Sequence, residues 1–210
     1  IDRERWSGKV MNRKIGMYSA AVNAASVLAF AVFMLAGFTH GCYFASMFIA
    51  FSFVPMMCAY AGAAAEERKT AGYTAAAFSA AYAAVILLVY FAQLTTVRFG
   101  GLTEQAQALL DFQQMGLFFS FDLLGYALMA LSTFFAGLTL DAQTASEKWL
   151  KALLLIHGVF FISCLAAPML GIFTAGGPAW IGVLVLEFWC VYFFPVGVLS
   201  FCRFRAMKRN

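Results

Sequence analysis

Six long stretches of this chain carry almost no charged side chain, and this feature limits the fold more than any other. They cover residues 15–38, 42–64, 71–97, 115–140, 152–175 and 179–202. Because a helix rises about 1.5 Å per residue, each stretch can cross the ~30 Å hydrocarbon core of a bilayer. Their continuous apolarity excludes the alternating pattern of an outer-membrane barrel. We therefore predict an all-α polytopic membrane protein, with residues 1–210 in a single six-helix transmembrane bundle.

The distribution of charge predicts how the bundle is oriented. Only 11% of the residues are charged, whereas about a quarter are charged in soluble domains. Of the 14 Lys and Arg residues, all but Arg98 lie at the two termini or in the connections after the second and fourth stretches. Since Lys and Arg in short connections are retained in the cytoplasm, we expect both termini there. The net charge of +4 then reflects topology, and we expect no nucleic-acid partner.

The beginning of the chain has two interpretations. Met11, followed by Asn12, Arg13 and Lys14, resembles a natural start. If Met11 is the start, residues 1–10 are a non-native addition, such as vector sequence or a tag remnant. If it is not, they are a native tail. The apolar run that follows is about 24 residues long, longer than the usual 7–15 residues of a signal peptide core, so we treat it as a retained span.

Asp122 and Glu187 lie deep inside two of the uncharged stretches. A carboxylate in lipid costs roughly 2.5 to 3.5 kcal/mol, so it needs a partner, a water-filled cavity or a bound proton. Both acids lie about 10 to 12 Å from the outer surface, on helices that run in the same direction. We expect them to face one outward-opening cavity and to share a proton or bind a cation. The alternative is that each acid is hydrogen-bonded and ties helices together.

Other polar and aromatic side chains lie near this layer. Gln93 approaches it from the third stretch, and Tyr126 and Trp189 follow the two acids. Aromatic faces beside carboxylates suit an organic cation. His157 lies inside the fifth stretch, near its cytoplasmic end, and is either a proton relay or a buried hydrogen-bonded side chain. The candidate substrate-binding or ion-binding residues are Asp122, Glu187, Gln93, Trp189, Tyr126 and His157.

We predict no catalytic residue, no cofactor and no metal site. The five cysteines include no C-x-x-C pair, and free cysteine in an apolar helix behaves as a small hydrophobic residue. The two histidines, His40 and His157, are expected near opposite membrane surfaces. They are therefore too far apart to share a metal ion.

Three further features bear on transport. The outer connection, residues 98–114, is amphipathic and predicts a short surface helix, which either caps a pocket or only joins two spans. Pro55 and Pro195 lie near the middle of their stretches, where proline can kink or break a helix. Residues 39–46 read THGCYFAS and residues 156–163 read IHGVFFIS. This similarity either comes from a 3+3 inverted repeat, an arrangement common in transporters, or is a coincidental match between two segments built from the same few apolar residue types.

The segments VILLVYFAQLTTVR (85–98), FDLLGYALMALSTFFAGL (121–138) and IHGVFFISC (156–164) resemble an uncharacterised group of bacterial, Firmicute-type membrane proteins with several spans. The resemblance implies a location in the bacterial cytoplasmic membrane. It implies no activity and transfers no catalytic residue, because that group has no known activity.

The sequence favours binding or transport of a small solute, with a cation preferred, through an acidic and aromatic pocket that opens outward. Two alternatives stay open: a non-catalytic sensor or accessory subunit, and an intramembrane enzyme, which we favour less. The expected partners are the lipid bilayer, a small-molecule or cation ligand, and either a partner membrane subunit or further copies of the chain.

Overall fold

The computed structural model describes residues 2–173 and 179–207, with side chains described from Val10 to Phe173 and from Trp180 to Met207. Within these ranges the backbone is helical and forms no strand. A π-helical turn, Gln93–Val97, and two short 3-10 segments, Glu66–Arg68 and Phe112–Gln114, extend or join the longer helices. The α-helices are α1 (Asp2–Leu35), α2 (Thr39–Ala63), α3 (Lys69–Ala92), α4 (Glu104–Leu110), α5 (Leu117–Leu138), α6 (Ala145–His157), α7 (Phe160–Met169) and α8 (Ala179–Ala206).

Six segments among the described residues are long and apolar enough to span a membrane: Val10–Leu35, Thr39–Ala63, Glu66–Val97, Leu117–Leu138, Ala145–Met169 and Trp180–Ala206. They confirm the predicted all-α bundle of six spans, and the chain is an integral membrane protein. The fifth span begins at Ala145, whereas we predicted residue 152. Its start is fixed by a capping box, in which Thr144 accepts from the Glu147 backbone and the Glu147 carboxylate accepts from the Thr144 backbone.

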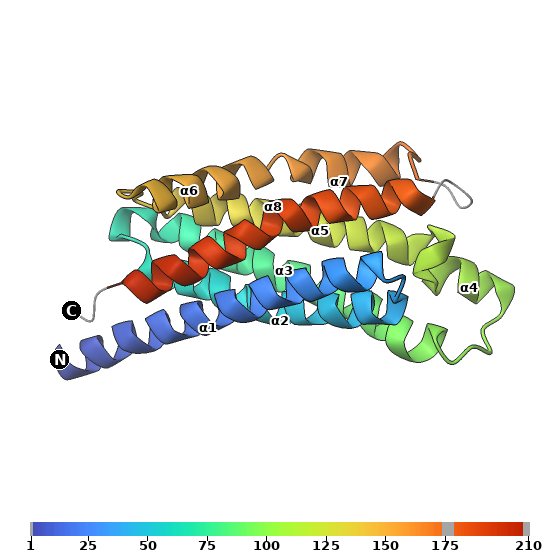
Figure 1. Ribbon diagram of the computed structural model, residues 1–210, viewed down its shortest axis with the longest axis horizontal. Helices are drawn as coiled ribbons and strands as arrows, with labels where there is room; N and C mark the ends of the chain where they lie inside the picture. The colour runs from blue at the N-terminus through green and yellow to red at the C-terminus, as the bar shows by residue number, and fades with distance from the viewer. Residues whose placement is uncertain (1, 174–178, 208–210) are drawn as a thin grey trace.

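The helices form a closed ring in cross-section. In order, α1 packs on α2, α2 on α3, α3 on α5, α5 on α6 and α7, α6 on α8, and α8 on α1. Helix α2 also contacts α5 across the interior. Both chain termini lie at one end of the bundle, which we call the terminal end, and α4 lies at the opposite end, which we call the α4 end (Figure 1).

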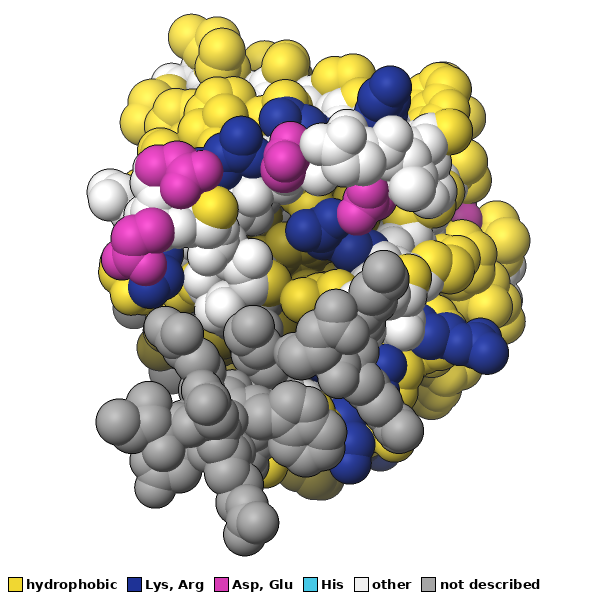
Figure 2. All heavy atoms as spheres, turned by 90° about the vertical axis from the view of Figure 1, so that its left-hand side faces the viewer, with side chains coloured by type: hydrophobic (Ala, Val, Ile, Leu, Met, Phe, Trp, Pro, Cys, Tyr) yellow, Lys and Arg dark blue, Asp and Glu magenta, His cyan; other side chains and the backbone are white. Residues whose placement is uncertain are grey.

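Charged side chains gather at the terminal end. Figure 2 shows Lys and Arg side chains beside Asp and Glu on this face, with apolar side chains around them. Glu147 and Arg203 form an ion pair that joins α6 to α8, and Arg13 donates to the Arg205 carbonyl, 3.2 Å away, which joins α1 to α8. The asymmetry of charge along the sequence is therefore an asymmetry between the two ends of the bundle.

The fifth span is interrupted, and the interruption lies at neither of the prolines, Pro55 and Pro195, at which the sequence allowed a kink or a break. Helices α2 and α8 continue through Pro55 and Pro195, whereas α6 ends at His157 and α7 begins at Phe160 (Figure 1). A Cβ added to Gly158 would lie 2.9 Å from a ring carbon of Phe134 on α5. The close approach of α5 at this glycine, together with the hydrogen bonds of His157 described below, accounts for the position of the break.

The two similar octets occupy different settings. The first begins with Thr39, at the start of α2, whereas the second contains Gly158, at the interruption between α6 and α7. The inverted repeat stays a prediction.

Close helix contacts depend on small residues. A Cβ on Gly72 of α3 would lie 2.7 Å from the Ala61 Cα of α2, and a Cβ on Gly197 of α8 would lie 2.9 Å from the Ala24 Cβ of α1. Small residues that let backbones approach are typical of membrane helix interfaces, where packing replaces the hydrophobic effect as the driving force.

We predict that Gly72→Ala lowers the free energy of unfolding by about 1 to 3 kcal/mol, because the backbone of Ala61 cannot move aside as a flexible side chain could. Gly182→Ala is the matched control, since nothing lies within 4 Å of its added Cβ. Thermal unfolding in detergent measures both. Equal effects of the two substitutions would contradict the assigned α2–α3 contact.

Candidate functional site

Asp122 lies in the second turn of α5, inside the ring of helices and only 4% exposed. Its Oδ1 atom is buried and has no hydrogen-bond partner. The side chain of Tyr90, from α3, lies beside the carboxyl group and can donate to it. Among the side chains that the structure describes, no Lys, Arg or His takes part in the interactions of this carboxyl group. Within that part of the chain, the acid has no fixed counter-charge.

Four buried tyrosines surround this acid, and we call the group the Asp122 cluster: Asp122, Tyr43, Tyr82, Tyr90 and Tyr126. Each tyrosine interacts electrostatically with the carboxyl group. The rings form two pairs, with centroids 5.4 Å apart for Tyr43 and Tyr90 and 6.1 Å apart for Tyr82 and Tyr126. The Tyr82 hydroxyl is also buried without a hydrogen-bond partner. The cluster therefore contains more polar atoms than its own contacts satisfy.

Tyr126 and Trp189 connect the Asp122 cluster to His157. The Tyr126 and Trp189 rings meet edge to face at 5.4 Å, and Trp189 Nε1 donates to His157 Nε2 at 3.2 Å. Thr133 Oγ1 lies 2.8 Å from the other ring nitrogen, Nδ1. Because Nε2 accepts, the network assigns the proton to Nδ1, which donates to Thr133. The imidazole is thus neutral and uses both nitrogens in binding other helices.

Gln93 lies at the α4 end and holds the connection that follows α4. Its Nε2 donates to the Leu110 carbonyl at 2.7 Å, and its Oε1 accepts from the Phe112 backbone at 3.0 Å. Gln93 is the first residue of the π-helical turn, a local irregularity that is frequent at functional sites. Through these bonds the Phe112 ring lies over the Asp122 cluster, 6.0 Å from Tyr43 and 6.1 Å from Tyr90.

Glu187 has different surroundings from Asp122. It lies on α8 and is half-buried, with Oε1 enclosed and without a hydrogen-bond partner. Its electrostatic neighbours are Cys42 and Cys190. The structure records no contact between the two carboxyl groups, both of which belong to the described part of the chain.

A polar pocket of about 340 Å³ opens at the α4 end, directly above the cluster. Its lining includes both Tyr43 and Gln93. Arg98 and Asp111 bring opposite charges to the lining but do not form an ion pair. The α4-end pocket is lined by His40, Tyr43, Gln93, Arg98, Asp111 and Gln113, with Thr39 and Val97.

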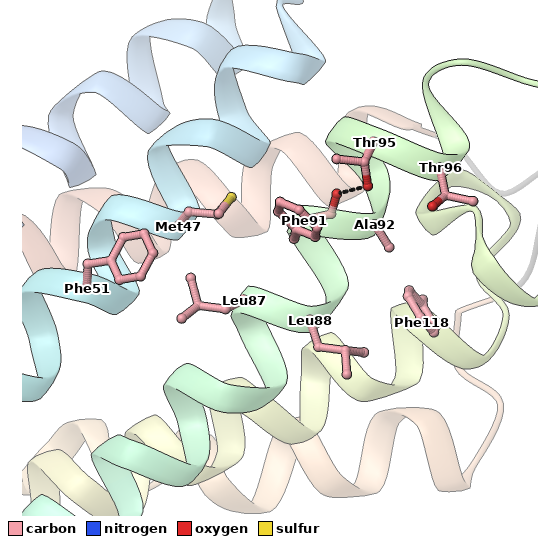
Figure 3. Close-up of a pocket in the computed structure, with 9 residues that line it drawn as sticks. All are labelled: Met47, Phe51, Leu87, Leu88, Phe91, Ala92, Thr95, Thr96 and Phe118. Carbon is pink, nitrogen blue, oxygen red and sulfur yellow. Dashed lines mark hydrogen bonds between the residues drawn. The ribbon is translucent and has the colours of Figure 1, made fainter.

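A second hollow, of about 740 Å³, is an apolar groove between α2, α3 and α5 (Figure 3). Met47 and Phe51 of α2 line one side of the groove. Leu87, Leu88 and Phe91 of α3 line another side, and Phe118 of α5 lies at one end. Thr95 and Thr96 contribute hydroxyl groups, but Thr95 Oγ1 is bonded to the Phe91 carbonyl at 2.6 Å. The groove suits a hydrocarbon chain, and Asp122 lines neither this groove nor the α4-end pocket.

The sequence-predicted residues thus fall into three groups. Asp122, Tyr126, Trp189 and His157 are joined by contacts, Gln93 lies above them at the α4 end, and Glu187 lies apart. Sequence reasoning missed Tyr43, Tyr82 and Tyr90. Tyr82 and Tyr90 could have been found, because residues 82, 86, 90 and 93 share one face of a helix. The described residues contain no group of three His, Cys, Asp or Glu side chains able to hold a metal ion.

Comparison with protein-family models, with curated proteins and with solved structures found no match to this chain. The site is therefore interpreted from its own geometry.

We predict that Trp189→Phe lowers the free energy of unfolding by about 1 to 3 kcal/mol, because His157 Nε2 loses its donor and stays buried. Trp149→Phe is the control, since Trp149 is exposed. Denaturant unfolding in detergent measures both. An unchanged stability of Trp189→Phe would contradict the assigned Trp189–His157 bond.

Proposed function

We propose that this membrane protein binds a small cation at Asp122 and takes part in its transport across the membrane. The observation that carries the proposal is the buried Asp122 carboxyl group, with Oδ1 unpartnered and no basic side chain interacting with it. A buried charge without a partner is strongly destabilising. A bound cation or proton removes that cost, and intramembrane acids commonly mark ion and substrate pathways.

The surroundings of Asp122 favour a small cation over a large one. The hydroxyl groups of Tyr82 and Tyr90 and the carboxyl group supply oxygen atoms, and Tyr82 Oη is free of other bonds. The rings of Tyr126, Trp189 and Phe193 pack on one another at 5.4 and 5.0 Å. Since Asp122 lines neither hollow, we propose a compact cation in place of a bulky organic one.

The charge asymmetry supports an orientation. Lys and Arg side chains gather at the terminal end (Figure 2), and Arg98 is the one such residue in the connection at the α4 end. By the positive-inside rule we propose that both termini lie in the cytoplasm of a bacterium and that the α4-end pocket opens to the outside.

The exposed fifth span favours a second role, that of an accessory or oligomeric membrane subunit. The segment Ala145–Met169 is the least buried of the six spans. The second half of this span is α7, in which Ile162 and Met169 are exposed and only Ala167 is buried. A partner helix would cover this face in the same way that α1 covers α8.

We predict that one of Li⁺, Na⁺, K⁺, tetramethylammonium or H⁺ raises the unfolding temperature of the purified protein at constant ionic strength. A ligand at 100 times its dissociation constant stabilises the folded state by about 2.7 kcal/mol. The shift disappears in Asp122→Asn, which removes the charge and keeps the shape of the side chain.

Asp141→Asn is the matched control, because Asp141 is an exposed acid in the connection between α5 and α6. It should respond to the cation like the unmodified protein. Absence of a shift with every cation and at every pH, or an equal shift in Asp122→Asn, would overturn the proposed function.

A further inference from the structure

We propose that the cation bound by Asp122 is a proton and that it exchanges with the α4-end pocket through Tyr43 and Tyr90. This inference rests on the proposed function and names the ligand of the same site. It also assigns a proton-relay role to two tyrosines that the sequence pattern did not single out.

The route begins at Tyr43, which lines the α4-end pocket. Gln113 Nε2 donates to Tyr43 Oη at 3.2 Å, so this bond uses an acceptor position of the hydroxyl and leaves its proton free to be donated inward. The Tyr43 ring lies 5.4 Å from the Tyr90 ring, centroid to centroid. Tyr43 therefore touches the pocket on one side and the interior of the cluster on the other.

Tyr90 completes the route, because its side chain lies beside the Asp122 carboxyl group. Ser46, one turn further into α2 than Tyr43, lies next to Tyr90, and its hydroxyl oxygen is buried and has no hydrogen-bond partner. Hydroxyl groups both accept and donate. The proposed line of proton transfer therefore runs from Tyr43, by way of Ser46 and Tyr90, to Asp122.

The proton balance along this line is simple. A hydronium ion in the pocket gives its proton to Tyr43 Oη, whose own proton passes inward to Tyr90 Oη, directly or across Ser46. Tyr90 then gives its proton to the Asp122 carboxylate. Each hydroxyl loses one O–H bond and gains another, the pocket keeps a water molecule, and the carboxylate becomes a neutral carboxylic acid.

The groups that face Asp122 favour a proton over a metal ion, because the described residues contain no group of three His, Cys, Asp or Glu side chains that could hold a metal ion. No cationic side chain competes for the carboxylate, and Glu187 is not among its neighbours. The side chains of α4 and α6 contribute no titratable group to its interactions. The titratable neighbours are Tyr43 from α2, Tyr82 and Tyr90 from α3, Tyr126 from α5 and Cys164 from α7, all uncharged at neutral pH.

At the terminal end the interior of the bundle contains packed side chains that bond to one another. At the terminal end Tyr60 Oη and Ser200 Oγ bond to each other at 2.7 Å, and the Tyr60 ring packs on Phe204 at 5.0 Å. Both Tyr60 and Phe204 are fully buried. These side chains contribute no free hydroxyl group to a route from the terminal end.

The test is infrared spectroscopy of the protein in lipid vesicles over a pH series. A protonated carboxyl group has a C=O stretch that moves when its proton is replaced by deuterium. The Asp122 band is the C=O band that is absent from the spectrum of Asp122→Asn. The rate at which this band changes frequency after transfer to D₂O measures the rate of proton exchange at Asp122. We expect Tyr43→Phe and Tyr90→Phe each to slow this exchange by about tenfold or more, which corresponds to ~1.4 kcal/mol on the barrier.

Tyr60→Phe is the matched control, because it removes a hydroxyl from an equally buried tyrosine outside the route, and it should leave the rate unchanged. Two variants on the route guard against a folding defect in one of them, and the unfolding temperature checks both. Exchange at the unmodified rate in both variants overturns the route. Absence of a protonated Asp122 band at every pH, together with stabilisation by an alkali cation, overturns the proton and leaves the proposed function standing.

Discussion

The structure depends on one constraint: inside a bilayer, no water satisfies a polar group that the protein itself leaves unsatisfied. Helices meet this constraint for the backbone, and small residues such as Gly72 and Gly197 then let the helices pack closely. Most interior side chains follow the same rule. Ser132 donates to the Ala75 carbonyl, Tyr60 bonds to Ser200, and His157 bonds to Thr133.

Against this background Asp122 is an exception. Its Oδ1 atom and the Tyr82 hydroxyl are buried and have no hydrogen-bond partner. This is so although four tyrosines pack around the one carboxyl group. His157, by contrast, has a partner at each ring nitrogen. The two groups thus differ: His157 is a fixed link between α5, α6 and α8, whereas Asp122 is the acid at which we propose that a ligand binds.

The sequence was sufficient to predict the number of spans, because length and apolarity decide whether a helix can cross a membrane. It also identified Asp122, since a charge in lipid is conspicuous. Helical spacing places Tyr82 and Tyr90 on one face of α3, but it does not show that this face is turned toward Asp122, because a membrane helix is apolar on its lipid face as well as on its packed face. Tyr43 lies on another helix, and no spacing in the sequence relates it to Asp122. The break at Gly158 was not predictable from proline positions, since it follows from the approach of Phe134 on another helix.

The most direct test of this account is the stability of Asp122→Asn at neutral and alkaline pH in the absence of any added metal or organic cation. If the carboxyl group is kept for ligand binding and not for packing, the neutral amide should leave the free energy of unfolding equal to or above that of the unmodified protein. If Asp122 is a structural link between helices, Asp122→Asn should lower the free energy of unfolding by about 1 to 3 kcal/mol, as expected when a buried group loses its hydrogen-bond partner. That result would contradict the account.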